Sequence, residues 1–170
     1  MHAEGRRQAI CRNLEQSRQP ISATALAGQF GVSRQVIVGD IALLRASGAK
    51  ITATPRGYVI LGEDSCPVRQ IACQHDGAQI REELYAIVDQ GCTVLDVTVE
   101  HPIYGELTGP LQVSNRHQVD EFVRRVEEAD ALPLSHLTEG IHLHALSCPD
   151  EAAFRRVTEE LRRLHILLTD

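Results

Sequence analysis

A polar segment that contains both glycine and proline, Gly62-Glu-Asp-Ser-Cys-Pro67, separates two parts of the chain with different patterns of apolar residues. Before it, apolar residues recur with the spacing of short helices, and after it β-branched runs alternate with helical stripes. Because glycine and proline interrupt regular structure, we expect a domain boundary here. The 170 residues suffice for two small domains, since independent domains need about 55–65 residues. We therefore predict one domain over residues 1–62 and a second over residues 67–170.

The charge of the chain is divided unevenly between these two parts. The whole chain carries −6 at pH 7, but residues 1–60 hold eight Lys or Arg and only three acids, which gives them +5 and leaves −11 for the rest. With 43% hydrophobic and 24% charged residues, both parts have the composition of folded domains. A basic part joined to an acidic part indicates that the first part contacts DNA or another phosphate polymer.

The apolar stretches are short and the cysteines are scattered. No apolar signal-peptide core follows the N-terminus, and charged residues interrupt every long apolar stretch, so we expect a soluble cytoplasmic protein without a membrane partner. The chain has no Cys-x-x-Cys pair typical of a zinc ribbon or a redox motif. We expect reduced, mostly packing thiols at Cys11, Cys66, Cys73, Cys92 and Cys148.

Three short helices are predicted before the boundary. Apolar periodicity indicates helices over residues 6–16, 23–29 and 34–46, the second capped by Ser22 and the third by Ser33. Gly31 lies between the last two, where a turn with positive φ costs a glycine little. We expect the stripe of the third helix to be Val36, Ile37, Ile41 and Leu44. Two helices joined by such a turn predict a helix-turn-helix.

The start of the third helix carries side chains suited to reading bases. In a helix-turn-helix the second helix of the motif enters the major groove, and its first residues meet base edges. These are Ser33, Arg34 and Gln35, of which Arg pairs with guanine and Gln with adenine. Residues 50–61 alternate around Thr54-Pro-Arg-Gly57 and predict a hairpin, the wing, with Arg56 at its tip. The alternative is a three-helix module for binding another protein.

Strands and helices alternate after the boundary and predict an α+β sandwich with helices on one face, broadly ferredoxin-like. The expected strands are 68–73, 93–99, 107–113, 141–146 and a short last one over 166–168. The expected helices are 78–90, one capped by Ser114 and running to about residue 129, and 149–164.

A few polar residues lie where this pattern calls for apolar ones. His142 and His144 alternate on one strand, so their side chains leave the same face about 7 Å apart, at a rise of roughly 3.3 Å per residue. Glu83 falls in the apolar stripe of the helix after Cys73, and His75 lies at the end of the preceding strand. Three imidazoles and a carboxylate suit zinc, nickel, cobalt or ferrous iron. The alternative is that the histidines only hydrogen-bond to neighbours and that Glu83 pairs with an arginine.

Several motifs together resemble a known family. In the first part they are Gly31-Val-Ser-Arg-Gln-Val-Ile-Val, Asp40-Ile-Ala-Leu-Leu-Arg45 and Ala53-Thr-Pro-Arg-Gly-Tyr58. In the second they are Cys73-Gln-His75, Glu82-Glu-Leu-Tyr85, Val99-Glu-His-Pro-Ile-Tyr-Gly-Glu-Leu107 and Gly140-Ile-His-Leu-His144. Over nearly the whole chain the sequence is similar to niacin-responsive transcriptional repressors, in which a winged helix precedes a three-histidine domain. The departures from the family are small: Gly39, inside the expected recognition helix, should weaken its helicity by about 1 kcal/mol relative to Ala.

The resemblance implies a repressor of nicotinate salvage, transport or NAD synthesis genes, which binds operator DNA as a homodimer with nicotinic acid as co-repressor. It implies a divalent metal, for which we expect nickel or zinc, at His75, Glu83, His142 and His144. His101 matches a further histidine of the family, and we place it with Tyr104 at the effector pocket; the alternative is that it only fixes the loop. We expect no enzymatic activity. Two alternatives remain: a regulator for which the metal is the signal, and a metalloenzyme with a DNA-binding domain.

Overall fold

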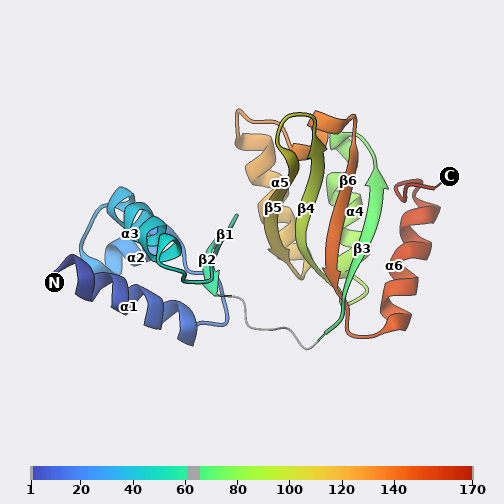
Figure 1. The fold of residues 1–170 in the computed structure, drawn as a ribbon. Helices are drawn as coiled ribbons and strands as arrows, with labels where there is room; N and C mark the ends of the chain where they lie inside the picture. Colours follow the sequence, from blue (N-terminus) through green and yellow to red (C-terminus); the bar gives the residue numbers. More distant parts are fainter. Residues whose placement is uncertain (1, 61–65, 170) are drawn as a thin grey trace. The chain divides into compact units, whose positions relative to one another are not determined.

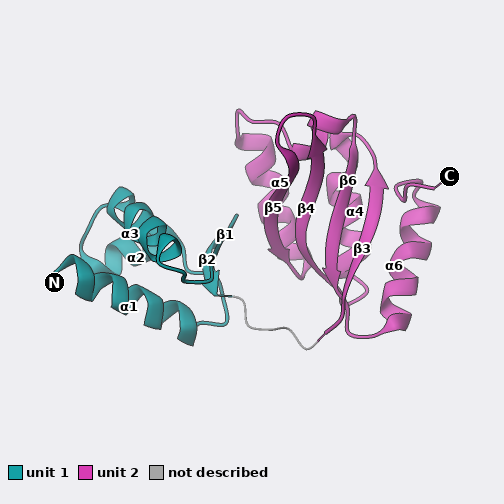
Figure 2. Cartoon of the chain, in the orientation of Figure 1, with its two compact units in different colours: residues 1–63 teal, residues 64–170 magenta. Residues whose placement is uncertain are grey.

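The computed structural model describes residues 2–60 and 66–169, which form two compact units, Met1–Glu63 and Asp64–Asp170 (Figure 2). Each unit has its own cluster of buried apolar side chains, and no residue belongs to both clusters. Within the described residues, no helix is long and apolar enough to cross a membrane. The two units are therefore described separately.

The N-terminal unit consists of three helices and a hairpin. Ser22 and Ser33 cap the second and third helices as expected, since each hydroxyl accepts a hydrogen bond from the backbone N–H three residues on. Gly31 has φ +63° in the turn between them. The elements are α1 (Ala3–Gln16), α2 (Ala23–Phe30), α3 (Arg34–Ala46), β1 (Ile51–Thr54) and β2 (Gly57–Ile60).

One face of α3 differs from the prediction. Val36 is 39% exposed, while Asp40 is buried on the same face as Ile37 and Ile41. The Arg6 guanidinium on α1 donates to the Asp40 carboxylate, with Nε 2.6 Å from Oδ2. A buried carboxylate needs such a partner, and apolar periodicity alone assigns charged residues to the outside, so the predicted stripe was wrong at this position.

The C-terminal unit is an α+β domain built on a four-stranded antiparallel sheet in the order β3-β6-β4-β5, which confirms the predicted fold class (Figure 1). The last strand in the chain, β6, lies between β3 and β4, so the helix joining β3 and β4 passes over the strand inserted between them. The elements are β3 (Val68–Gln74), η1 (Gly77–Gln79), α4 (Ile80–Val88), β4 (Thr93–His101), β5 (Gly105–Val113), α5 (Arg116–Glu128), η2 (Leu134–Thr138), β6 (Ile141–Ser147) and α6 (Glu151–Arg163).

Two details of this unit correct the sequence prediction. The expected strand over 166–168 is only an isolated bridge between Cys73 and Leu167, flanked by two backbone hydrogen bonds to β3. The cap of α5 is Asn115 and not Ser114, because the Asn115 side chain accepts from the Gln118 N–H. Ser114 instead donates its N–H and hydroxyl to the Gln118 side chain.

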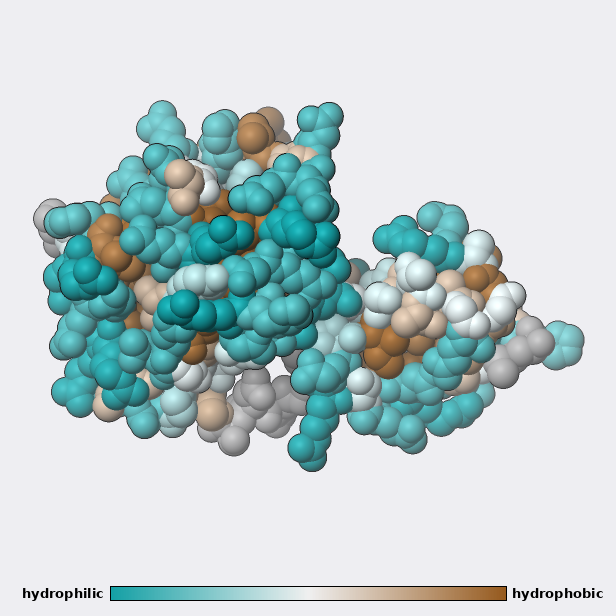
Figure 3. Space-filling model, turned by 180° about the vertical axis from the view of Figure 1, so that it is seen from behind, coloured by the Kyte–Doolittle hydropathy of each residue, from teal (hydrophilic) through white to brown (hydrophobic). Residues whose placement is uncertain are grey.

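The core of the C-terminal unit lies between one face of the sheet and its helices. In Figure 1, α4 and α5 lie behind the sheet and α6 lies beside β3. The helices bury one stripe each, for example Ala153, Val157 and Leu161 on α6. From the helix side, the surface of this unit is mainly hydrophilic (Figure 3). The side chains of Val94 and Leu146, between sheet and helices, are fully buried, as is that of Leu161.

Candidate metal centre

Four polar side chains lie inside this core. His142 and His144 leave β6 on the side that faces the helices, and Glu83 on α4 faces them. His75 follows β3 and closes the cluster. Glu83 is 2% exposed, His142 and His144 are 3% exposed, and His75 is 8% exposed. The residues selected by periodicity are thus brought together from three segments of the chain.

The Glu83 carboxylate is the centre of the cluster. His75 Nε2 lies 2.7 Å from Oε2, His142 Nε2 lies 2.9 Å from Oε1, and His144 Nε2 lies 3.4 Å from Oε1. The rings of His75 and His144 each stack edge-on against His142, with centroids 4.9 and 4.8 Å apart. The alternative partner for Glu83, an arginine, is not among its hydrogen-bond or ion-pair partners within the described part of the chain.

The other nitrogen of each imidazole is held by a backbone carbonyl. The Nδ1 atoms of His75, His142 and His144 lie 2.5, 2.8 and 2.6 Å from the carbonyl oxygens of Asp76, Gly140 and Asp96. A carbonyl only accepts, so each Nδ1 carries a hydrogen, and a ring that has no second proton turns an Nε2 lone pair towards Glu83. This orientation through the second nitrogen is typical of metal-ligating histidines.

His144 Nε2 is the atom of this cluster that most needs a further partner. It is buried and makes no hydrogen bond to any residue described here. A buried polar atom without a partner is costly, and a bound ion is one way to satisfy it. Nitrogen and carboxylate donors suit zinc, nickel, cobalt or ferrous iron. The residues present therefore fit a divalent transition metal.

The electrostatics of the cluster follow from the single carboxylate. Burial alone would lower the pKa of His144 and of His75. Attraction between His144 and Glu83, and the hydrogen bond of His75 to Glu83, outweigh burial and raise both pKa values above the ordinary 6.5. Burial would likewise raise the pKa of Glu83, but the three imidazoles hold it well below its ordinary value. Glu83 is therefore an anion at neutral pH.

Two residues of this region were not singled out as site residues in the sequence. Gly140 has φ +89°, and a Cβ there would lie 2.2 Å from the carbonyl oxygen of His75. Cys73 is fully buried on β3, and burial together with Glu83 raises its pKa. The Cys73 Sγ, an oxygen of Glu83 and a ring nitrogen of His142 all lie within 4.8 Å of one another. Both residues are the first of a motif noted in the sequence, which was the available signal.

His101 and Tyr104 lie at the turn between β4 and β5. Their rings are 5.0 Å apart, and the Nδ1 of His101 accepts from the backbone N–H groups of Ile103 and Tyr104 at 3.2 and 3.3 Å. Tyr104 is 73% exposed. These contacts agree with the alternative hypothesis, in which His101 only fixes the loop.

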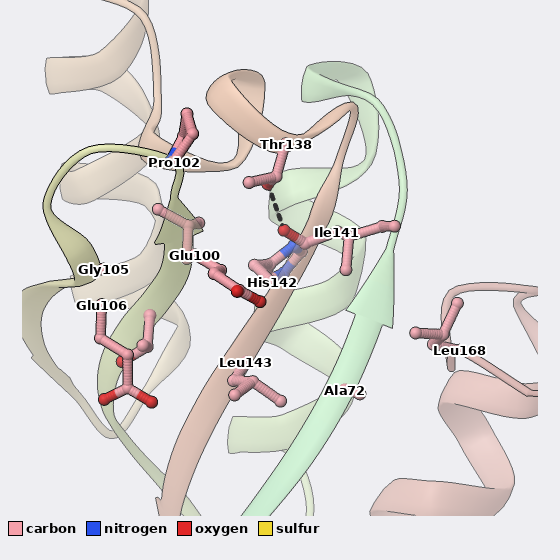
Figure 4. Close-up of a pocket in the computed structure, with 12 residues that line it drawn as sticks. Ala72, Glu100, Pro102, Gly105, Glu106, Thr138, Ile141, His142, Leu143 and Leu168 are labelled. Carbon is pink, nitrogen blue, oxygen red and sulfur yellow. Dashed lines mark hydrogen bonds between the residues drawn. The ribbon is translucent and has the colours of Figure 1, made fainter.

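A cavity of about 750 Å³ opens on the face of the sheet away from the helices (Figure 4). Glu100 of β4 and Glu106 of β5 contribute two carboxylates, while Ile141 and Leu143 of β6 supply apolar surface. Among the described residues that line it there is no Lys or Arg. The cavity therefore favours a cationic or neutral occupant over an anion.

The expected DNA-reading residues lie at the start of α3 and in the wing. Ser33, which caps α3, is exposed, and so are Arg34 and Gln35 in the first turn of α3. Arg56 lies in the turn of the hairpin, where it is partly buried and its guanidinium donates to the Gln19 side chain at 3.4 Å. Arg56 therefore lies against the loop before α2 instead of projecting from the wing.

Comparison with known proteins agrees with the two-unit architecture. Residues 6–59 match an HTH domain family, and residues 68–170 match the 3H domain family. The "Probable transcription repressor NiaR" of Thermotoga maritima is 44% identical over 165 residues, which is 97% of this chain and 94% of that relative. The "Transcription repressor NadR" of Bacillus subtilis is 41% identical over 169 residues, with the same coverage of both chains. The resemblance inferred from the motifs is thus confirmed, and the chain belongs to the family of niacin-responsive transcription repressors, in which a helix-turn-helix domain precedes a 3H domain.

Proposed function

We propose that this protein is a cytoplasmic, homodimeric transcription repressor of genes for nicotinate transport or NAD synthesis, with nicotinic acid as co-repressor. Both relatives are named transcription repressors, which supports a regulator and not an enzyme. In this proposal the N-terminal unit binds operator DNA and the C-terminal unit senses the effector. The observation that supports a sensor role for the C-terminal unit is the convergence of three imidazoles on buried Glu83.

His75, Glu83, His142 and His144 would hold a divalent metal, nickel or zinc, in the C-terminal unit. The pre-set Nδ1 hydrogen bonds support this role, because they leave the three Nε2 atoms facing one point, where each can bind the ion once its proton is displaced. When bound, such an ion supplies a positive charge that can fix a carboxylate or a pyridine nitrogen. The protein residues orient the donors and exclude water from them.

Ser33, Arg34 and Gln35 would read bases in the major groove, and Arg56 would contact the backbone. Exposure of the first three residues at the start of α3 supports this assignment. For Arg56 to reach DNA, its bond to Gln19 would have to open. In a homodimer the two recognition helices would meet half-sites separated by whole turns of DNA.

We place the effector near His101 and Tyr104, at the turn between β4 and β5. The contacts of His101 support this choice: its Nδ1 accepts from two backbone N–H groups, so its Nε2 carries a hydrogen that could be donated to the carboxylate of nicotinic acid. Repression would follow from linkage: nicotinic acid and operator DNA each strengthen the binding of the other.

The test is the affinity for operator DNA, measured by fluorescence anisotropy at fixed salt. Nicotinic acid is titrated at saturating metal, and metal is then titrated at fixed nicotinic acid. We expect nicotinic acid to tighten binding by about 5- to 150-fold, the usual range of coupling between two sites. His101→Ala should remove that gain without weakening operator binding in the absence of effector. Nicotinamide, which lacks the carboxylate, is the matched control ligand.

A metal-sensing regulator is the second candidate, and the deep burial of the four donors favours it. In that case metal alone would produce the full gain in operator affinity. A change of less than about twofold on adding nicotinic acid at saturating metal would overturn the niacin assignment, since real couplings are several-fold.

A further inference from the structure

Cys73 lies directly beside one of the candidate metal ligands. In the pairing of β3 with β6, Cys73 is the cross-strand partner of His142, and Ile71 is the partner of His144. Side chains of directly paired residues leave the sheet on the same face. The Cys73 thiol therefore points, with the histidines, into the space between sheet and helices, and its exposure is 0%.

The distances bring the thiol into the same cluster as the nitrogen and oxygen donors. The Cys73 Sγ, an oxygen of Glu83 and a ring nitrogen of His142 lie within 4.8 Å of one another. Zinc–sulfur and zinc–nitrogen bonds of about 2.3 and 2.1 Å, at the tetrahedral angle that zinc prefers, place the two ligand atoms roughly 3.6 Å apart. Inward movements that total about 1 Å, shared between the side chains, would be enough for a common ion.

The two other buried thiols occupy a different part of the unit. Cys92 precedes β4 and Cys148 follows β6, where Thr93 pairs with Ser147. Both are as buried as Cys73, at 0% and 2% exposure, and both belong to the same apolar core. Of these three core cysteines, Cys73 is the one that joins the cluster of metal donors.

We propose that Cys73 is a sulfur ligand of the metal centre, in addition to the imidazoles and Glu83. The inference rests on the metal site of the proposed function. On coordination, the S–H bond breaks, its proton passes to the buffer, and a metal–sulfur bond forms. A site with sulfur, nitrogen and carboxylate donors selects zinc, nickel, cobalt or ferrous iron, and it discriminates against magnesium, calcium and manganese.

Cobalt(II) added to the full-length, metal-free protein is the probe, because a cobalt–thiolate bond gives a charge-transfer band in the near ultraviolet that histidine and carboxylate ligands do not give. We expect this band in the wild type and in the controls Cys92→Ser and Cys148→Ser. We expect Cys73→Ser to lose the band while it keeps visible cobalt bands from the remaining ligands. X-ray absorption of the zinc-loaded wild type should show a sulfur neighbour at about 2.3 Å beside nitrogen or oxygen at about 2.0–2.1 Å.

The outcomes separate this inference from the proposed function. Cobalt that binds the wild type with only nitrogen and oxygen neighbours overturns the role of Cys73 and leaves the four-residue site standing. A charge-transfer band that persists in Cys73→Ser also overturns it. Absence of any cobalt or zinc binding removes the metal site itself. If Cys73→Ser does not fold, the absorption spectrum of the wild type decides, because it requires no variant.

Discussion

Gly140 is a single residue on which the orientation of two histidines depends. Its carbonyl accepts from His142 Nδ1 at 2.8 Å and from the backbone N–H of His75 at 3.4 Å. At φ +89° it packs so closely on His75 that an added Cβ would meet the carbonyl oxygen at 2.2 Å. We predict that Gly140→Ala displaces His75 and weakens zinc binding by about 10- to 100-fold, as removal of a group that orients ligands does. Competition with a chromophoric chelator measures the affinity.

The matched control for Gly140→Ala is Gly77→Ala. Gly77 lies between His75 and Glu83 in the chain, but no atom lies within 4 Å of the position of its missing Cβ. This variant should keep the zinc affinity of the wild type. Equal affinities of Gly140→Ala and wild type would show that the loop adjusts without moving His75, and would contradict the prediction.

The pKa shifts of His75 and His144 predict how metal binding depends on pH. Because Glu83 raises both pKa values, these imidazoles still bind protons above pH 6.5 in the metal-free protein. The metal must displace those protons, so its apparent affinity rises by up to about tenfold per pH unit for each proton lost, until the pH exceeds the raised pKa values. Calorimetry in buffers of different ionisation enthalpy counts the protons released.

The same groups give the metal-free unit an opposite dependence on pH. The contacts of protonated His75 and His144 with Glu83 contribute stability that is complete below pH 6.5 and is lost as the pH rises through their raised pKa values. The contribution from the lowered pKa of Glu83 is present above pH 4.5 and is lost as the pH falls through its folded value. Metal affinity that stays constant from pH 6 to 8 would refute the preceding prediction. A metal-free unit whose free energy of unfolding does not fall over that range would refute the expected effect of His75 and His144.

At the scale of residues, the sequence predicts the candidate metal ligands better than it predicts the residues that lie around them. His142 and His144 were found because alternation on a strand is a local property, and Glu83 because a carboxylate interrupts an apolar stripe. Cys73 looks like an ordinary core residue until its strand is paired with β6. The burial of Asp40 depends in the same way on Arg6, which is 34 residues away in the chain.

At the scale of elements, the start of a helix was predicted correctly where a single residue can serve as its N-cap. It was missed where two adjacent residues are both good N-caps. Ser22 and Ser33 each stand alone before an apolar stripe, and both cap their helices. Ser114 and Asn115 are adjacent and both are good caps. The structure uses Asn115, because the Gln118 side chain reaches back to Ser114. The N-cap propensities of Ser and Asn do not predict this side-chain contact.

The ends of some strands were missed because they are set by pairing with a neighbouring strand and not by the residue types of the segment. β4 continues to His101 and β5 begins at Gly105, beyond the β-branched run, because the two pair up to their turn. At the C-terminus, residues 166–168 have strand composition, yet His165 at φ +59° turns the chain and one bridge to Cys73 forms. Composition identifies a strand, whereas its neighbours determine its length.

For the whole molecule, the sequence predicts the α+β class but not the order of its strands. The alternation of elements and the polar segment over 62–67 are local signals. The insertion of β6 between β3 and β4 depends on which strand edges pair with each other. No single segment of the sequence encodes this pairing. This insertion decides the site, since it places His142 beside Cys73 and brings His144 near Glu83.

The two units have separate cores, and the candidate metal donors all belong to the C-terminal one. We therefore predict that zinc slows amide hydrogen exchange in β3, α4 and β6, and leaves α1 to α3 unchanged. A ligand that binds only the folded state stabilises it by about 2.7 kcal/mol when its free concentration is 100 times Kd. Exchange with mass spectrometry of the full chain, with zinc and with a chelator, measures the protection of each segment. Chelation should return the C-terminal segments to faster exchange, whereas equal protection of both units would show that they unfold as one.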